Sequence, residues 1–289
     1  MSFLDKAAYI LAPGTLVIGL LYFYGSTYMD TYYSFFGVPP RDLQFSVQGY
    51  LANSPRAIFV PMLVLFFLGL VLVMILLMIN HALAGPRNVA RRRVVARWFM
   101  YPSLVVTLLL PLTLSESVAG ARGQALVGEP LGLWAPLVVA LGAALSLFGT
   151  RLSPGDWGAP DKRAPTVRRV WFAAEVMLVG LIVAALFMYV TRYATSAGWT
   201  DASSEADKGF RGNPYVVIHS RVKIAHDLPG IVAVDEGSGS GPYRFRYTGF
   251  VALTKTPTRF YLVSRNWRAS QVVLVLPDDG TFLAEVRPV

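Results

Sequence analysis

The sequence predicts a membrane α-helical bundle of about five transmembrane helices, followed by a small all-β domain outside the cytoplasm. Three observations lead to this prediction. The 289 residues are 54% hydrophobic and 15% charged, whereas soluble domains usually carry about 25% charged residues. Five apolar runs approach or reach the roughly 20 residues that a helix needs to cross a bilayer core of about 30 Å. Beyond Thr195 the pattern changes to short alternating runs, which are typical of strands.

The predicted transmembrane domain covers residues 1–194. Its first apolar run follows Asp5 and Lys6, a poor start for a signal peptide, and no small-residue cleavage site comes after it. We therefore expect a retained helix there. The third and fourth runs are short and contain prolines, so their ends are the least sharply marked. The five predicted spans lie near residues 7–28, 58–83, 98–114, 131–149 and 170–191.

Basic residues are distributed unequally between the two sides of this predicted bundle. One side carries eleven of them: Lys6, Arg87, Arg91, Arg92, Arg93, Arg97, Arg151, Lys162, Arg163, Arg168 and Arg169. The other side carries four: Arg41, Arg56, Arg122 and Arg192. Because basic loops stay in the cytoplasm, the N-terminus is predicted to be cytoplasmic and the C-terminal domain extracellular.

The same placement accounts for the formal net charge of +9. Short basic loops can contact the head groups of anionic lipids, and no nucleic-acid-binding motif is present, so no nucleic-acid partner is expected. The expected partners are the lipid bilayer, further copies of the chain and ions. The loop residues expected to face lipid are Arg91, Arg92, Arg93, Arg168 and Arg169.

The polar part of the chain divides into two predicted segments. Residues 195–211 are small and polar, which predicts a linker. Residues 212–289 are predicted to form a β-sandwich or a barrel-like domain with six or seven strands. Pro277–Gly280 predicts a hairpin turn between the last two strands. The predicted strands are Tyr215–His219, Val222–Ala225, Ile231–Val234, Tyr243–Leu253, Arg259–Ser264, Gln271–Leu276 and Thr281–Arg287.

The first external loop, Met29–Arg56, is dense in aromatic residues around a Gly-Val-Pro-Pro turn. This composition favours a short ordered segment that lies on the membrane surface. A functional vestibule or a partner contact is the alternative that the sequence leaves open.

Groups that could perform chemistry are scarce. There are no cysteines, and no phosphate-binding loop, dinucleotide-binding glycine motif or zinc-protease motif occurs. His219 and His226 are seven residues apart, which would place them on opposite faces of a continuous strand. We therefore predict no catalytic residue, no cofactor and no metal site, and we do not expect an enzyme. A membrane enzyme would need polar groups that converge in the bilayer.

One carboxylate stands inside a predicted span. Glu175 lies about one turn beyond Trp171, and an ionisable group in a span is a functional-site hypothesis by default. It could form a structural ion pair with a nearby arginine, or line a pore or proton path. Glu116 and Arg192 are expected at the external ends of spans, where water solvates them. Polar rings near Glu175 and near Glu116 or Arg192 would suit an oligomeric pore.

Two stretches carry a family resemblance. Tyr32–Leu51 reads Tyr-Tyr-Ser-Phe-Phe-Gly-Val-Pro-Pro-Arg-Asp-Leu-Gln-Phe-Ser-Val-Gln-Gly-Tyr-Leu, and the tail runs from Tyr-Thr-Gly-Phe at 247–250 to Trp267. Both stretches resemble uncharacterised multi-pass membrane proteins of actinobacteria. The resemblance implies a bacterial cytoplasmic membrane, and it implies no activity and no site residue.

Two functions fit these observations best. The first is a homo-oligomeric ion channel or pore with an extracellular β domain, which the scarcity of catalytic groups and Glu175 favour. The alternative is a non-conducting membrane sensor or scaffold whose β domain binds an external ligand or partner.

Overall fold

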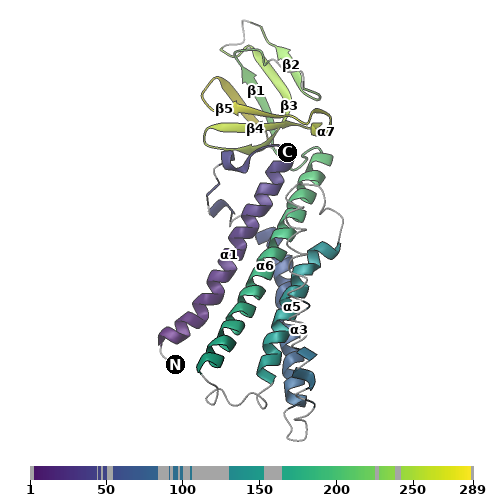
Figure 1. Cartoon of the computed structure of the whole chain (residues 1–289). Helices are drawn as coiled ribbons and strands as arrows, with labels where there is room; N and C mark the ends of the chain where they lie inside the picture. Colours follow the sequence, from purple (N-terminus) through teal and green to yellow (C-terminus); the bar gives the residue numbers. More distant parts are fainter. Residues whose placement is uncertain are drawn as a thin grey trace. The chain divides into compact units, whose positions relative to one another are not determined.

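The computed structural model describes residues 3–43, 45–46, 48–50, 55–83, 91, 94–96, 98–99, 105, 130–152, 165–224, 228–237 and 242–287. The chain forms two compact units. We call Met1–Tyr24 with Ser54–Ser196 the helical unit, and Gly25–Asn53 with Ala197–Val289 the β unit. The boundary between the units falls within two helices, so each of these helices contributes residues to both. Figure 1 shows the elements of both units.

Four helices correspond to predicted spans. They are α1 (Phe3–Phe35), α3 (Pro55–Ala82), α5 (Pro130–Leu152) and α6 (Pro165–Asp207). They extend beyond the predicted spans, except that α3 ends one residue before its predicted span does. The predicted span at 98–114 lies almost entirely outside the described residues. Within the described part, Met62–Ala82 and Trp171–Asp207 are long and apolar enough to cross a membrane, and Trp134–Gly149 is a shorter apolar helix. The complete bundle of five spans stays a prediction.

The helical unit combines small packed contacts with a large apolar surface. Val139 of α5 and Ala185 of α6 are buried together, and Phe23 of α1 meets Phe187 of α6 edge to face at 5.6 Å. By contrast, none of the apolar window of Met62–Ala82 is buried. Extended apolar surface of this kind marks contact with lipid or with other protein.

The β unit contains one antiparallel sheet. Its strands are β1 (Tyr215–Ser220), β2 (Val232–Asp235), β3 (Phe245–Lys255), β4 (Arg259–Ser264), β5 (Val273–Pro277) and β6 (Phe282–Arg287). The order is β5-β4-β3-β1-β6, and β2 pairs with β3. The long strand β3 pairs with β1 along one edge. Its other edge pairs with β2 through Phe245–Thr248 and with β4 through Phe250–Lys255.

The predicted hairpin between the last two strands is wrong. β5 and β6 stand at opposite ends of the strand order and do not pair. The turn residues Pro277–Gly280 do lie between the two strands, but turn chemistry does not decide whether the flanking strands are neighbours. The described strands form a single six-stranded antiparallel sheet, and its packing as a β-sandwich or a barrel-like domain stays a prediction.

The short connection between β5 and β6 requires a curled sheet. Pro277 and Phe282 are separated by at most about 18 Å, at ~3.6 Å per residue. In a flat sheet, four spacings of ~4.8 Å would separate the two edge strands by about 19 Å. The connection is not fully extended, since the Asp278 N–H donates to the Thr258 carbonyl. Curling is helped by bulges at Val216/Ile218 in β1 and Ala252/Thr254 in β3.

Two predicted segments of the polar region have a different structure. Val222–Ile224, the described part of a predicted strand, follows β1 and is not a strand. Ser220 Oγ accepts a hydrogen bond from the Val222 N–H and donates one to the Val222 carbonyl, which closes a turn. The predicted linker at 195–211 is largely helical, since α6 continues to Asp207. Its small residues serve packing, as the next section describes.

Candidate functional site

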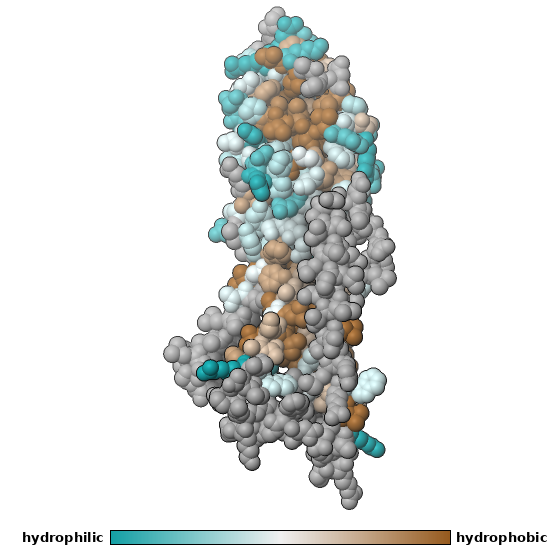
Figure 2. Space-filling view, in the orientation of Figure 1, coloured by the Kyte–Doolittle hydropathy of each residue, from teal (hydrophilic) through white to brown (hydrophobic). Residues whose placement is uncertain are grey.

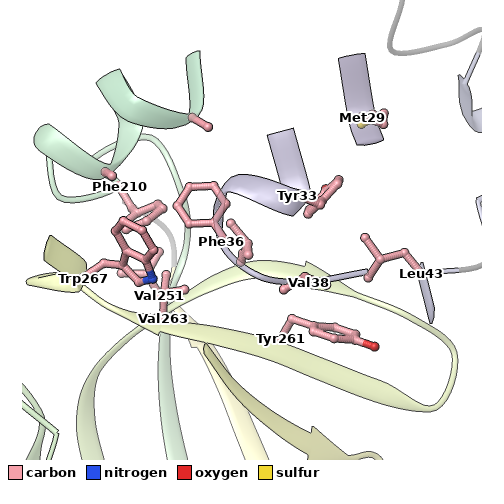
Figure 3. Close-up of a cluster of buried hydrophobic side chains, with 13 residues drawn as sticks. Met29, Tyr33, Phe36, Val38, Leu43, Phe210, Val251, Tyr261, Val263 and Trp267 are labelled. Atoms are coloured by element: carbon pink, nitrogen blue, oxygen red, sulfur yellow. The ribbon is translucent and has the colours of Figure 1, made fainter. Parts of the chain in front are cut away.

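The core of the β unit is shared between the sheet and the ends of two helices (Figure 3). One face of β3 and β4 packs against the last turns of α1 and α6 and against the short 3-10 helix η1 (Pro40–Leu43). The aromatic first loop therefore supplies protein core, and its position on a membrane surface stays a prediction. The buried members are Met29, Tyr33, Phe36, Val38, Leu43, Ala202, Ala206, Phe210, Val251, Leu253, Tyr261, Val263 and Trp267.

Phe36 stands at the centre of this shared core. Its ring lies 5.1 Å from the ring of Trp267 and 5.6 Å from that of Phe210, centroid to centroid. Each such aromatic pair contributes about 0.5–1.5 kcal/mol beyond its buried area. Phe210 has a φ of +56°, a left-handed conformation that is unfavourable for a bulky residue. Its full burial holds it there and turns the chain after α6 into the core.

Small residues let α1 and α6 approach closely inside the β unit. Gly198, Ala202 and Ala206 follow one another at a spacing of four, so they share one helix face, and all three are buried. A Cβ atom on Gly198 would lie 2.8 Å from the carbonyl oxygen of Tyr28. The composition that predicted a linker is therefore the composition of a close helix–helix contact.

Two tyrosines hydrogen-bond to two carboxylates across this contact. The Tyr28 hydroxyl donates to Asp201 Oδ2 at 2.9 Å, and the Tyr32 hydroxyl donates to Glu205. Tyr28 and Tyr32 are four residues apart, as are Asp201 and Glu205. The two hydrogen bonds therefore lie about one helical turn apart, and together they fix the register between α1 and α6. Burial, and then the hydrogen bond to Glu205, raises the pKa of Tyr32 above its ordinary value.

The helix α7 (Trp267–Ser270) is tied to the same helix ends. Arg268 donates from Nε to Asp207 Oδ1 and from a terminal nitrogen to Ser203 Oγ, both at 2.8 Å. Its guanidinium also lies 5.6 Å from the ring centroid of Phe35. Within the β unit, the ends of α1 and α6 are therefore held to each other by tyrosine–carboxylate hydrogen bonds, and to the sheet region by aromatic packing and the Arg268–Asp207 ion pair.

The rest of this sheet face is partly exposed and carries both apolar and charged residues. Pairing places Val234, Arg246, His219 and Leu283 in one row across β2, β3, β1 and β6. His219 Nε2 lies 3.6 Å from Glu285 Oε2, and Arg246 Nε lies 3.0 Å from Glu236 Oε1. In the view of Figure 2, hydrophobic residues gather over the β strands with hydrophilic residues around them. Apolar residues within a polar rim are typical of a binding surface.

The two described pore candidates, Glu175 and Arg192, lie in different surroundings on α6. Glu175 is exposed on α6, beside exposed Phe172 and Val179. Arg192 is buried, with 6% of its surface exposed, so the expectation of a solvated arginine is wrong. Its neighbours Tyr189 and Val190 are buried too, which places it in a packed stretch of α6. Glu175 and Arg192 are about 25 Å apart along the helix, at ~1.5 Å per residue.

The other predicted residues are only partly described. Glu116 lies outside the described residues, as do Arg92, Arg93 and His226. Arg91 and Arg169 are exposed, and Arg168 is described only as a helical residue of α6. Among the described residues, no three His, Asp or Glu side chains form a group that could hold a metal ion.

Comparison of the chain with protein-family models, with curated proteins and with solved structures gives no match. The functional argument therefore depends on the geometry alone. The tyrosine–carboxylate pairs were missed from sequence, although the matching spacing of Tyr28 with Tyr32 and of Asp201 with Glu205 was visible. The spacing does not say which helices face each other, so it could not predict that these residues pair.

Proposed function

We propose that this chain is a membrane-anchored sensor or scaffold, non-conducting and without enzymatic activity, whose β unit binds an external ligand or partner. The observation that supports this proposal is the shared core, in which Phe36 of the first loop, Phe210 after α6 and Trp267 of the sheet region pack together. A ligand that displaces strands β3 or β4 would press on the last turns of α1 and α6. A sensor needs this kind of contact between its binding part and its membrane helices.

The proposal includes a location. The two long apolar helices and the bias of basic residues support a multi-pass protein of a bacterial cytoplasmic membrane with its N-terminus inside. A tag after Val289 is then expected to be cleaved by protease added outside intact cells. Protection of the tag in intact cells, together with cleavage after lysis, would contradict an extracellular β unit.

Ion flux through proteoliposomes tests the functional part. Liposomes that contain the purified full chain are expected to release a trapped ion no faster than empty liposomes. Flux that rises with the amount of protein would overturn the non-conducting proposal.

A homo-oligomeric channel is the second candidate, and Glu175 favours it. A carboxylate surrounded by exposed Phe172 and Val179 on an apolar helix is costly in lipid unless protein or water covers it. Several copies around an axis would provide that cover. If liposomes conduct, Glu175→Gln is expected to change the flux at least about tenfold, whereas Glu236→Gln in the β unit serves as the matched control. Equal flux in the wild type and Glu175→Gln would remove Glu175 from the conduction path.

A further inference from the structure

Three strands of the β unit have an edge that pairs with no described strand. They are β2, β5 and β6. β2 has four residues, and β5 ends at Pro277, which has no N–H to donate. β6 has six residues and pairs with β1 at every position without a register shift. A regular edge of this length is a ready template for another strand, and proteins usually cover or disrupt such an edge.

The β6 edge is open although the sheet is curled. Leu283 is 51% exposed and Val286 is 56% exposed. Their partners on β1 are His219 and Val216, which point to opposite faces of the sheet. An apolar side chain is therefore accessible on each face of β6, Leu283 on one and Val286 on the other, whereas Phe282 and Ala284 pack partly against buried residues of the sheet.

We propose that β6 pairs with β6 of a second copy of this chain, antiparallel, about a two-fold axis through Ala284. A two-fold axis perpendicular to the sheet keeps each face continuous, so residues of the same face must oppose each other. Two registers of this kind pair five residues of β6 with five residues of its copy. One is centred on Ala284 and the other on Glu285. The second register places Glu285 directly against its own copy, and like charges directly opposite each other are unfavourable.

The register centred on Ala284 is self-complementary. Phe282 of each copy faces Val286 of the second copy, which places two apolar pairs on one face. Cross-strand pairs of aromatic and β-branched residues are favourable. On the other face, Leu283 of each copy faces Glu285 of the second copy, and Arg287, whose Nε lies 3.0 Å from Glu285 Oε1 of its own strand, balances that carboxylate. The occupant that fits this edge is therefore the same strand of another copy.

Disulfide cross-linking tests the pairing directly, because the chain has no native cysteine. Paired residues in antiparallel strands have Cα atoms about 4.5–5.5 Å apart, within the range that a disulfide spans. In full-length protein in native membranes, Ala284→Cys is expected to form a disulfide-linked dimer in most chains on mild oxidation. The matched controls are Val275→Cys on the edge of β5 and Val234→Cys on β2, which are expected to stay mostly monomeric.

A second variant keeps the test decisive if a single cysteine disturbs folding. The double variant Phe282→Cys with Val286→Cys is expected to cross-link between copies through two disulfides, because the two positions are too far apart within one strand. Dimer yields no higher than those of the controls, in both the single and the double variant, would overturn the proposal. That outcome would point to an extended segment of another protein as the occupant of the edge.

A charged residue on the edge provides the complementary test. In the Ala284→Cys background, Val286→Lys is expected to lower the cross-linking yield at least fivefold, because the lysine would face Phe282 of the second copy. Val222→Lys introduces the same charge at an exposed site away from the edge and is expected to leave the yield unchanged. Equal yields in the two lysine variants would also contradict the pairing. Neither result depends on whether the chain conducts ions.

Discussion

Two pairs of adjacent phenylalanines in this chain have opposite environments. Phe66 and Phe67 of α3 are exposed, with 68% of the Phe66 surface accessible. Phe35 and Phe36 at the end of α1 contribute to the core of the β unit, where Phe36 is 4% exposed. Both pairs read Phe-Phe, but Phe66 and Phe67 stand in a long apolar run, whereas Phe35 and Phe36 are followed by a Gly-Val-Pro-Pro turn. The difference shows that a Phe-Phe pair can lie on an exposed apolar surface or in a protein core, and that contacts with segments distant in sequence place Phe36 in the core.

The strongest way to break this comparison is to truncate one phenylalanine from each pair. Phe36→Ala removes a buried ring and its contacts with Trp267 and Phe210, which is expected to cost about 3–5 kcal/mol of unfolding free energy. Phe66→Ala is the matched control and is expected to cost less than about 1 kcal/mol, because its ring makes few protein contacts. Denaturant unfolding of the full chain in mild detergent measures both. Equal losses would contradict the assignment of Phe36 to a protein core.

Two glycines of α6 are expected to respond to substitution by alanine with opposite changes in stability. Gly198→Ala forces a Cβ atom against the Tyr28 carbonyl and is expected to destabilise the β unit by about 1–3 kcal/mol. Gly180→Ala meets nothing within 4 Å and is expected to stabilise the helix by about 0.5–1 kcal/mol. Thermal unfolding of both variants tests this. A neutral Gly198→Ala would mean that the two helices do not approach each other as described.

The tyrosine–carboxylate pairs are expected to give a smaller effect. Tyr32→Phe removes the donor to Glu205 and is expected to cost about 1–2 kcal/mol, whereas Tyr243→Phe, with its exposed 3.3 Å bond to the Gly280 carbonyl, is expected to cost less than about 0.5 kcal/mol.

The same tyrosine predicts a pH dependence. Burial raises the pKa of Tyr32 in the folded protein, so the unfolded chain loses this proton first, near pH ~10. Stability is then expected to fall as the pH rises above that value, and less so in Tyr32→Phe. Unfolding curves at several alkaline pH values measure the difference. The same slope in both proteins would contradict a buried Tyr32 hydroxyl.

The smallest expected effect lies on the sheet surface. The hydrogen bonds from Arg244 to Asp235 lower the pKa of Asp235 to about 2. This contribution to stability is present above the pKa of the unfolded chain, near ~4, and is lost as the pH falls toward 2. Asp235→Asn is expected to flatten that part of the stability profile slightly. Titration of the Asp235 carboxyl by NMR measures the pKa, and an ordinary value would contradict the pairing with Arg244.

Local patterns predicted the strands well. Alternation in Tyr243–Leu253 matches β3 closely, and the runs at 259–264 and 281–287 match β4 and β6. Strand residues alternate because each strand has two faces, and this signal is local. The same signal cannot show which strands are neighbours, so the turn after β5 was misinterpreted as a hairpin.

The shared core could not be predicted because it joins segments that are distant in sequence. Gly198, Ala202 and Ala206 are small, lie among polar residues and resemble a linker until Tyr28 is placed opposite them. Tyr33 and Phe36 are amphipathic or apolar and fit a membrane surface equally well. Arg192 was expected in water for the same reason, since its burial depends on neighbours that the local sequence does not specify.

The central claim is that the last turns of α1 and α6 belong to the folded core of the β unit. Native-state hydrogen exchange of the full chain in mild detergent tests it most directly. The amides of residues 197–207 are expected to exchange as slowly as those of β3 and β4, and Phe36→Ala is expected to speed both sets together. Fast exchange at 197–207 while β3 and β4 stay protected would contradict the shared core and restore the flexible linker.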